Sequence, residues 1–263
     1  MLQLREKEIF ETLKKMNKFE FVIIGGYAVN AYTLPRFSVD CDIVIKDKQE
    51  LKKIENTLVD LGYLRREDNK DKDSYYENFT RFEKDMGKSI KVSVDILVKE
   101  VLDRQTKTTF PADWVFDNSE VRVLRGKTIT EELKLRIINL DALFILKFIS
   151  CRLTDVRDIF MLAPNINNRK WVKEEILKKY NVEVLDKPRT KVRGTLRASK
   201  SPKTNHTFQS AIKREGLFDF EKLFLRVKEK ITSKQFKDNL QGVYGIIDDK
   251  IFEKHKKAIL DFG

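Results

Sequence analysis

The strongest constraint on the fold is a glycine pair that is followed, after a short segment, by two aspartates at alternate positions. An apolar run ending at Ile24 leads into Gly25 and Gly26, and Asp40 and Asp42 begin a second apolar run. Side chains alternate between the faces of a strand, so both carboxylates point the same way. Two like charges this close are costly unless water or a cation lies between them. The pattern therefore predicts a strand, a tight turn into a helix, and a second strand carrying an acidic site.

The net charge and the hydropathy pattern narrow the class of protein. The 263 residues carry a formal net charge of +12, and 36% of them are charged. A basic chain favours a polyanionic partner such as nucleic acid, although a lysine-rich composition also serves solubility alone. The hydrophobic fraction of 41% is enough for a core. No run of about 18 apolar residues is present, so we expect neither a membrane span nor a membrane partner.

The few cysteines and histidines give no metal or disulfide pattern. Cys41 and Cys151 have no spacing typical of a zinc site, which suits a reducing cytoplasm, the compartment that we expect. Cys41 lies between the two aspartates, so it should face the opposite side of the strand as a small core residue. His206 and His255 share no ligand spacing, and we expect both at the surface. The charged N-terminal residues lack the apolar centre of a signal peptide.

Hydrophobic periodicity predicts an α/β domain over residues 1–130. A proline at position 35 should end the helix that follows the glycines, and a glycine at position 62 suits a helix C-cap. We expect helices over residues 2–16, 27–34 and 49–61, strands over 19–24, 40–45, 75–83 and 89–98, and a short β-hairpin formed by 121–124 and 127–129.

A helical domain is predicted over residues 131–263. Residues 187–214 interrupt it with nine Lys or Arg, no acidic residue and two prolines, a composition typical of a mobile basic loop that can contact RNA or DNA. Helical patterns cover 139–152, 155–162, 170–179 and most of 218–262.

The ordered series of these residues resembles the polymerase-β-type nucleotidyltransferase superfamily. That family has a Gly-Gly or Gly-Ser turn, then Asp-x-Asp, then a third carboxylate on a later strand. Here the turn is Gly25-Gly26, the pair is Asp40 and Asp42, and the best third candidate is Asp95 in a strand-like run. The resemblance implies an α+β fold with a mixed β-sheet flanked by helices.

More narrowly, the chain is similar to the AbiEii/AbiGii abortive-infection toxin branch. The family pattern Arg-x-Ser-x-Asp-x-Asp is matched by Arg36, Ser38, Asp40 and Asp42. Lys147 matches a lysine that the family carries on a later helix. The motif that follows departs from the family at Thr154, where Lys is common. The resemblance extends over roughly residues 20 to 163 and implies toxin activity with an antitoxin-like protein as a partner.

This resemblance implies a Mg²⁺-dependent transfer of a nucleoside monophosphate from a nucleoside triphosphate (NTP), with Mn²⁺ as an alternative ion. Two metal ions can clamp the attacking and leaving oxygens of such a transfer. Three carboxylates would be catalytic and would hold the metal, namely Asp40, Asp42 and Asp95. Five residues would bind the NTP, namely Gly25, Gly26, Arg36, Ser38 and Lys147.

Each assignment also has a structural alternative. The glycines can form an ordinary strand-to-helix turn, and Asp40 and Asp42 can lie on a solvated strand face. Lys147 lies in an apolar helix and can instead extend to solvent. For Asp155 and Asp158 we expect structural support: Asp155 can cap a helix with Thr154, and Asp158 can form an ion pair with Arg152 or Lys147.

Three functions remain open from the sequence. An active nucleotidyltransferase can use RNA such as tRNA, a protein or a small molecule as its acceptor. A non-catalytic protein can keep the same fold to bind nucleic acid or a partner. A kinase-like enzyme can use the same pocket to transfer the terminal phosphate.

Overall fold

The computed structural model describes residues 2–66, 78–87, 90–104, 106–182, 220–245 and 247–262. The basic segment predicted over 187–214, with His206, lies outside these residues, as does the start of the strand predicted over 75–83. In the described part, no helix is both long and apolar enough to cross a bilayer.

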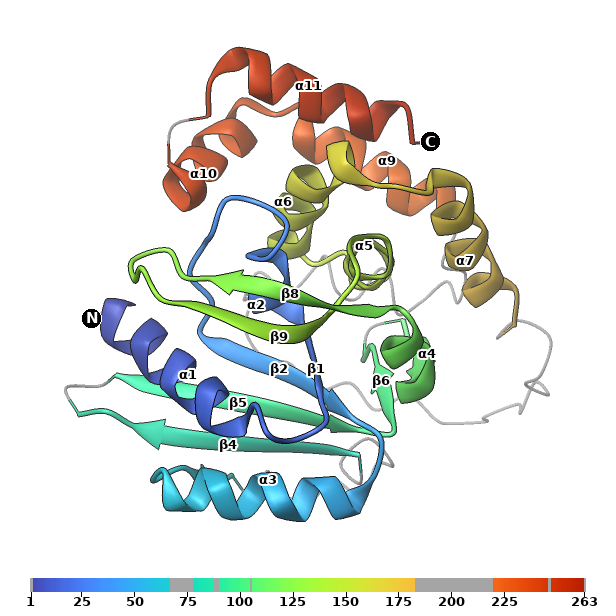
Figure 1. The fold of residues 1–263 in the computed structure, drawn as a ribbon. Helices are drawn as coiled ribbons and strands as arrows, with labels where there is room; N and C mark the ends of the chain where they lie inside the picture. Colours follow the sequence, from blue (N-terminus) through green and yellow to red (C-terminus); the bar gives the residue numbers. More distant parts are fainter. Residues whose placement is uncertain are drawn as a thin grey trace, which may run out of the picture.

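A mixed seven-stranded sheet forms the centre of the molecule (Figure 1). Strand β2 runs parallel to β5 and β1 runs parallel to β9, while the other neighbours are antiparallel. This mixed sheet flanked by helices confirms the predicted fold class. In spatial order the strands are β3 (Leu64–Arg65), β4 (Phe79–Asp85), β5 (Lys91–Val98), β2 (Asp40–Ile45), β1 (Val22–Ile24), β9 (Glu132–Ile138) and β8 (Ser119–Arg125).

The strand registers align four residues in one row across the sheet. Ile24 of β1 pairs with Asp42 of β2, Asp42 pairs with Asp95 of β5, and Asp95 pairs with Arg81 of β4. Directly paired residues point to the same face and have neighbouring side chains. The register therefore brings two carboxylates and a guanidinium together from three adjacent strands.

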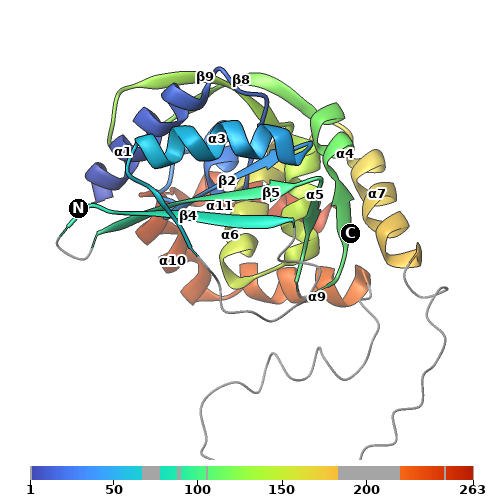
Figure 2. The same cartoon turned by 90° about the horizontal axis from the view of Figure 1, so that it is seen from below.

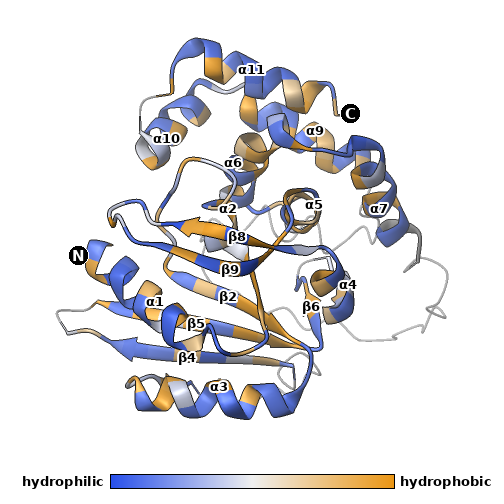
Figure 3. Cartoon of the chain, viewed as in Figure 1, coloured by the Kyte–Doolittle hydropathy of each residue, from blue (hydrophilic) through white to orange (hydrophobic). Residues whose placement is uncertain are grey.

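Helices cover both sides of this sheet. Helix α1 (Leu2–Met16) and helix α3 (Lys48–Asp60) lie together on one side of β4 and β5, with α6 (Leu153–Leu162) on the other (Figure 2). Each of α1 and α3 buries one apolar face, because polar residues occupy the remaining positions. Hydrophobic colour is concentrated on β1 and on α5 (Leu140–Ser150), which are enclosed by other elements (Figure 3).

The helix after the glycines differs from the prediction. Helix α2 comprises Gly25–Val29, so it begins on the glycines and ends well before Pro35. The segment that follows is held instead by Asn30, whose amide donates to the Arg36 carbonyl at 2.9 Å and accepts from the Arg36 N–H at 3.0 Å. This side-chain clamp gives the backbone partners that a longer helix would have supplied.

The β-hairpin after residue 118 is also longer than predicted. Its second strand is β9, not residues 127–129, and β9 continues the sheet past residue 130, where we expected the α/β part to end. Residues 127 and 128 form a loop, because the buried Glu6 carboxylate accepts both of their backbone N–H groups, at 2.6 and 2.7 Å.

The C-terminal helices share the core of the sheet region. Phe144 and Phe148 of α5 and Phe160 of α6 contact aromatic residues beyond position 219, including Phe220 and Phe262. The remaining elements are a two-stranded ribbon of β6 (Glu100–Leu102) and β7 (Thr109–Pro111), α4 (Ala112–Asp117), a 3-10 turn (Ala163–Asn165), α7 (Arg169–Val182), α9 (Phe220–Ile231), α10 (Lys234–Tyr244) and α11 (Asp249–Leu260).

Candidate active site

The three predicted carboxylates lie on adjacent strands β2 and β5. Asp95 is 7% exposed and receives a two-pronged contact from Arg81, with Nε to Oδ1 at 2.8 Å and Nη2 to Oδ2 at 2.6 Å. Asp40 is 42% exposed at the edge of the site, where it accepts from the Ser93 hydroxyl and lies 3.9 Å from Arg81 Nη2. The structure thus gathers all three carboxylates and adds a cation that the sequence analysis did not identify.

The glycine turn lies directly against two other predicted site residues. Gly25 has a φ of +66°, and a Cβ placed there would be 2.0 Å from Asp42 Oδ2. A Cβ at Gly26 would be 2.3 Å from the Ser38 hydroxyl oxygen. These glycines are therefore required for close approach to Asp42 and Ser38, and the space beside the Asp42 carboxylate exists because position 25 has no side chain.

Burial and mutual repulsion disfavour ionised carboxylates in this row. Burial and the Asp95 carboxylate raise the pKa of Asp42 to about 7. Burial also raises the pKa of Asp95, although the hydrogen bonds from Arg81 oppose that shift. Carboxylate oxygens are the ligands that Mg²⁺ prefers, and a cation would offset this cost. The donor set and the space left by Gly25 therefore fit a divalent metal ion.

The carboxylates do not, however, converge as a finished metal site. Over the described ranges, no group of three or more acidic, histidine or cysteine side chains is arranged to hold an ion. The reason is visible in the contacts, since Asp95 faces Arg81 and Asp40 faces Ser93. Metal binding would require these side chains to turn toward Asp42.

A second charged cluster lies on α5 and α6. Lys147 Nζ is 2.9 Å from both Asp155 Oδ1 and Asp158 Oδ2. The Tyr244 hydroxyl of α10 donates to Asp158 Oδ1 at 3.1 Å. Burial opposes the charge on Lys147, yet Asp158 and Asp155 together raise the pKa of its ammonium. Lys147 is thus held in its charged form and does not extend to solvent, the alternative that its apolar helix left open.

Arg36 is placed differently from the prediction that it binds NTP. Its Nε and Nη2 each lie 2.7 Å from an oxygen of Asp158, and its side chain is 11% exposed. The pocket beside the carboxylates is not lined by Arg36. Asp158 accepts from Nε and Nη2, and Nη1 donates to the Phe37 carbonyl at 3.0 Å, so all three nitrogens of the guanidinium are engaged and little capacity is left for a phosphate. These contacts are those of a residue that holds α6 to the segment before β2.

Asp155 and Asp158 have the supporting roles that we expected. Asp155 accepts the Arg152 backbone N–H at 3.1 Å and the Ser150 hydroxyl at 2.8 Å, which caps the start of α6. Asp158 pairs with Arg36 and Lys147, whereas the Arg152 guanidinium lies 3.4 Å from Asp103. His255 was predicted at the surface, but it is half-buried, and its Nδ1 lies 3.0 Å from the Phe160 carbonyl oxygen.

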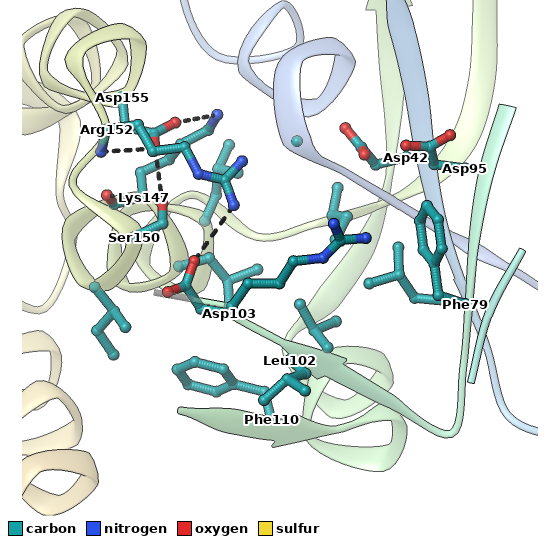
Figure 4. Close-up of a pocket in the computed structure, with 18 of the residues that line it drawn as sticks. Asp42, Phe79, Asp95, Leu102, Asp103, Phe110, Lys147, Ser150, Arg152 and Asp155 are labelled. Atoms are coloured by element: carbon teal, nitrogen blue, oxygen red, sulfur yellow. Dashed lines mark hydrogen bonds and ion pairs between the residues drawn. The ribbon is translucent and has the colours of Figure 1, made fainter. Parts of the chain in front are cut away.

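A pocket of about 460 Å³ joins the two charged clusters (Figure 4). Asp42 and Asp95 lie side by side at one end, and Lys147, Ser150, Arg152 and Asp155 lie at the other. Of the predicted residues, Gly25, Asp42, Asp95 and Lys147 line the pocket, whereas Gly26, Ser38 and Asp40 do not. Apolar side chains form the side between the two ends, including Phe79, Leu102 and Phe110.

Several pocket residues were missed by the sequence analysis. Arg81 and Phe79 lie within a predicted strand, and β4 pairs them with Asp95 and Leu97 of β5. The bounds of the two predicted strands do not fix this register, so the sequence analysis could not place Arg81 beside Asp95. Phe110 belongs to β7, and Asp103 directly follows β6; this two-stranded ribbon has no clear alternation in the sequence.

Comparison with protein families gives a match over most of the chain. The family model described as nucleotidyl transferase AbiEii toxin, type IV toxin–antitoxin system, matches residues 17–250. No curated protein matches the chain.

Solved structures similar to this one include two antibiotic-modifying enzymes and a toxin. The lincosamide antibiotic adenylyltransferase LnuA is 21% identical, with 60% of this chain and 95% of that chain covered and a TM-score of 0.40. ANT(2″)-Ia in complex with adenylyl-2″-tobramycin is 14% identical, with 67% of this chain and 99% of that chain covered and a TM-score of 0.47. MenT4, a nucleotidyltransferase toxin from Mycobacterium tuberculosis H37Rv, is 13% identical, with 99% and 92% covered and a TM-score of 0.44.

Proposed function

Because this chain belongs to the AbiEii family of nucleotidyltransferase toxins, we propose that it moves a nucleoside monophosphate from an NTP to an RNA hydroxyl with the help of Mg²⁺. The observation that carries this proposal is the pocket with Asp42 and Asp95 at one end and Lys147 at the other. The net charge of +12 supports an RNA acceptor, because phosphates attract a basic protein.

The reaction breaks a phosphoanhydride bond of the NTP and forms a phosphodiester bond to the acceptor. An acceptor hydroxyl oxygen attacks the α-phosphorus of the NTP, the bond from that phosphorus to the bridging oxygen breaks, and pyrophosphate leaves. We propose that Asp95 takes the hydroxyl proton, since burial raises its pKa and makes its carboxylate a better proton acceptor.

The other residues bind and orient. Lys147 would pair with the triphosphate, and its two carboxylate partners would fix its ammonium in one position. Gly25 and Gly26 would keep the turn close to Asp42 and Ser38. Mg²⁺ would be held by Asp40, Asp42 and Asp95, and when bound it supplies charge neutralisation at the phosphates.

The test follows the label from the NTP. The protein is incubated with Mg²⁺, total cellular RNA and each of the four NTPs labelled at the α-phosphate. We expect label in RNA, and we expect Asp42→Asn to lower the rate by at least about a hundredfold, because a neutral amide keeps the shape and loses the charge. Asp113→Asn is the matched control, since Asp113 is exposed and does not line the pocket.

Three outcomes would contradict the proposal. Label in protein instead of RNA would overturn the acceptor. In a parallel incubation with NTPs labelled at the γ-phosphate, transfer of label would replace nucleotidyl transfer with a kinase-like reaction. Equal rates for Asp42→Asn and the unaltered protein would remove the site assignment.

The family also supports an antitoxin protein as a partner. Its description names a type IV toxin–antitoxin system, so we propose that expression of this chain alone arrests growth. Asp42→Asn should relieve the arrest if toxicity depends on the transfer. Growth arrest by Asp42→Asn at the same protein level would separate toxicity from this pocket.

A further inference from the structure

Of the four described cationic residues that line the pocket, three form ion pairs with carboxylates that are described above. Lys147 pairs with Asp155 and Asp158, Arg152 pairs with Asp103, and Arg81 pairs with Asp95. Among these pairs, that of Arg81 is the one made to a residue proposed to bind metal.

The position of Arg81 is fixed by the sheet. Strand β4 pairs Arg81 directly with Asp95, and β5 pairs Asp95 directly with Asp42. The guanidinium donates to both Asp95 oxygens, at 2.8 and 2.6 Å, and Nη2 lies 3.9 Å from Asp40 Oδ2. The Arg81 guanidinium therefore lies next to two of the three proposed metal ligands.

This arrangement puts Arg81 in competition with a divalent ion. A metal bound to Asp95 would bring two positive charges next to the guanidinium, and like charges at contact distance repel strongly in a partly buried site. Arg81 is 29% exposed and lines the pocket, so it has open space in which to move.

We propose that Arg81 is a built-in counter-ion for the carboxylate row, which a divalent metal must displace from Asp95 before the site is complete. The inference rests on the proposed metal site. It makes Arg81 a positioning residue that sets the metal affinity, and it accounts for the absence of a converged acidic site in the described residues.

The first measurement is the affinity for Mn²⁺ alone, by isothermal titration or by the electron paramagnetic resonance signal of the free ion. We expect Arg81→Met to bind Mn²⁺ roughly five- to tenfold more tightly than the unaltered protein, because no ion pair has to be broken. Arg125→Met is the matched control: it removes the same charge from the far edge of the sheet, where Arg125 pairs with Glu132, and its affinity should not change.

The second measurement uses the unaltered protein, because Arg81→Met leaves Asp95 buried without its partner and can fail to fold. The ¹H–¹⁵Nε signal of Arg81 is followed by NMR during titration with Ca²⁺. We expect the signal to shift and its exchange with water to accelerate as the hydrogen bond to Asp95 breaks.

Two results would overturn the inference. Arg81→Met that binds Mn²⁺ no more tightly than Arg125→Met would show that the ion pair does not compete, and so would an Arg81 signal that stays unchanged at saturating Ca²⁺. Asp42→Asn tests the proposed metal site itself. If this variant binds Mn²⁺ as tightly as the unaltered protein does, the proposed metal site is wrong.

Discussion

At the scale of single residues, Gly25 makes the closest approach to the acidic row. Its φ of +66° is costly for any residue with a side chain, and its missing Cβ would contact Asp42 Oδ2 at 2.0 Å. Gly62 has a similar φ of +84°, but a Cβ there would meet only Lys84 Cε, at an ordinary 3.7 Å. The two positions share the backbone cost and differ in the steric cost.

We therefore expect Gly25→Ala to lower the free energy of unfolding by about 3 kcal/mol and Gly62→Ala by about 1 kcal/mol. Urea denaturation followed by circular dichroism measures both. Equal losses would mean that Asp42 turns aside at no cost and that the steric argument is wrong.

The acidic residues could be predicted because strand alternation alone fixes the relation between Asp40 and Asp42. Arg36 shows the limit of this reasoning. Its partner Asp158 is far away in the sequence, and only the packing of α6 against the segment before β2 shows that the guanidinium is engaged. The sequence motif could identify Arg36 as important without showing which anion it binds.

At the scale of elements, Asp158 connects α6 to three other parts of the chain. It is fully buried and accepts from Arg36 of the segment before β2, from Lys147 of α5 and from Tyr244 of α10. Burial alone would favour the neutral acid, but Lys147 and Arg36 together hold its pKa below the usual range. The carboxylate is therefore charged wherever the protein is folded near neutral pH.

We expect Asp158→Asn to destabilise the protein by about 3 kcal/mol at pH 7, because two buried cations lose a charged partner. A depressed folded-state pKa contributes stability that is fully present above the unfolded pKa, near 3.8; the contribution begins to decline as the pH approaches that value and is lost as the pH falls through the lower folded-state pKa. The difference between the two proteins, measured by urea denaturation from pH 7 to pH 3, should therefore shrink in acid. A difference that stays constant in acid would contradict this role, and Asp60→Asn, at an exposed helix end, is the control.

The long helices and central strands could be predicted because each has a clear period. Strand β2 has the predicted bounds, and α1 does too. The ribbon of β6 and β7 could not be predicted, because three-residue strands are too short to show alternation. The end of α2 was also missed, since the side-chain clamp of Asn30 has no periodic signal.

At the scale of the whole molecule, one hydrophobic core includes both halves of the chain. Phe148 of α5 stacks on Phe220 of α9 with ring centroids 5.5 Å apart, and Phe160 of α6 contacts Phe236 of α10 at 5.2 Å. The sequence suggested two domains because the composition changes after the strands. Composition carries no information about which faces pack together, so this continuity could not be predicted.

We expect a single unfolding transition as a consequence. The fluorescence of Trp114 and Trp171 reports on α4 and α7, which stack through the two indole rings at 6.4 Å, while circular dichroism reports on all helices. The two signals should have the same midpoint in urea. An earlier loss of helix signal would show that helices other than α4 and α7 unfold on their own, which would contradict a single transition.

The buried thiol of Cys41 can report how often strand β2, which carries the acidic residues, becomes accessible to solvent. Cys41 lies on β2 between Asp40 and Asp42 but faces the core, and its side chain is fully buried. A thiol reagent can reach it only when β2 separates from its neighbours. With Cys151 replaced by serine, the rate of thiol modification would measure the frequency at which β2 opens. The measurement needs no substrate and no label at the site.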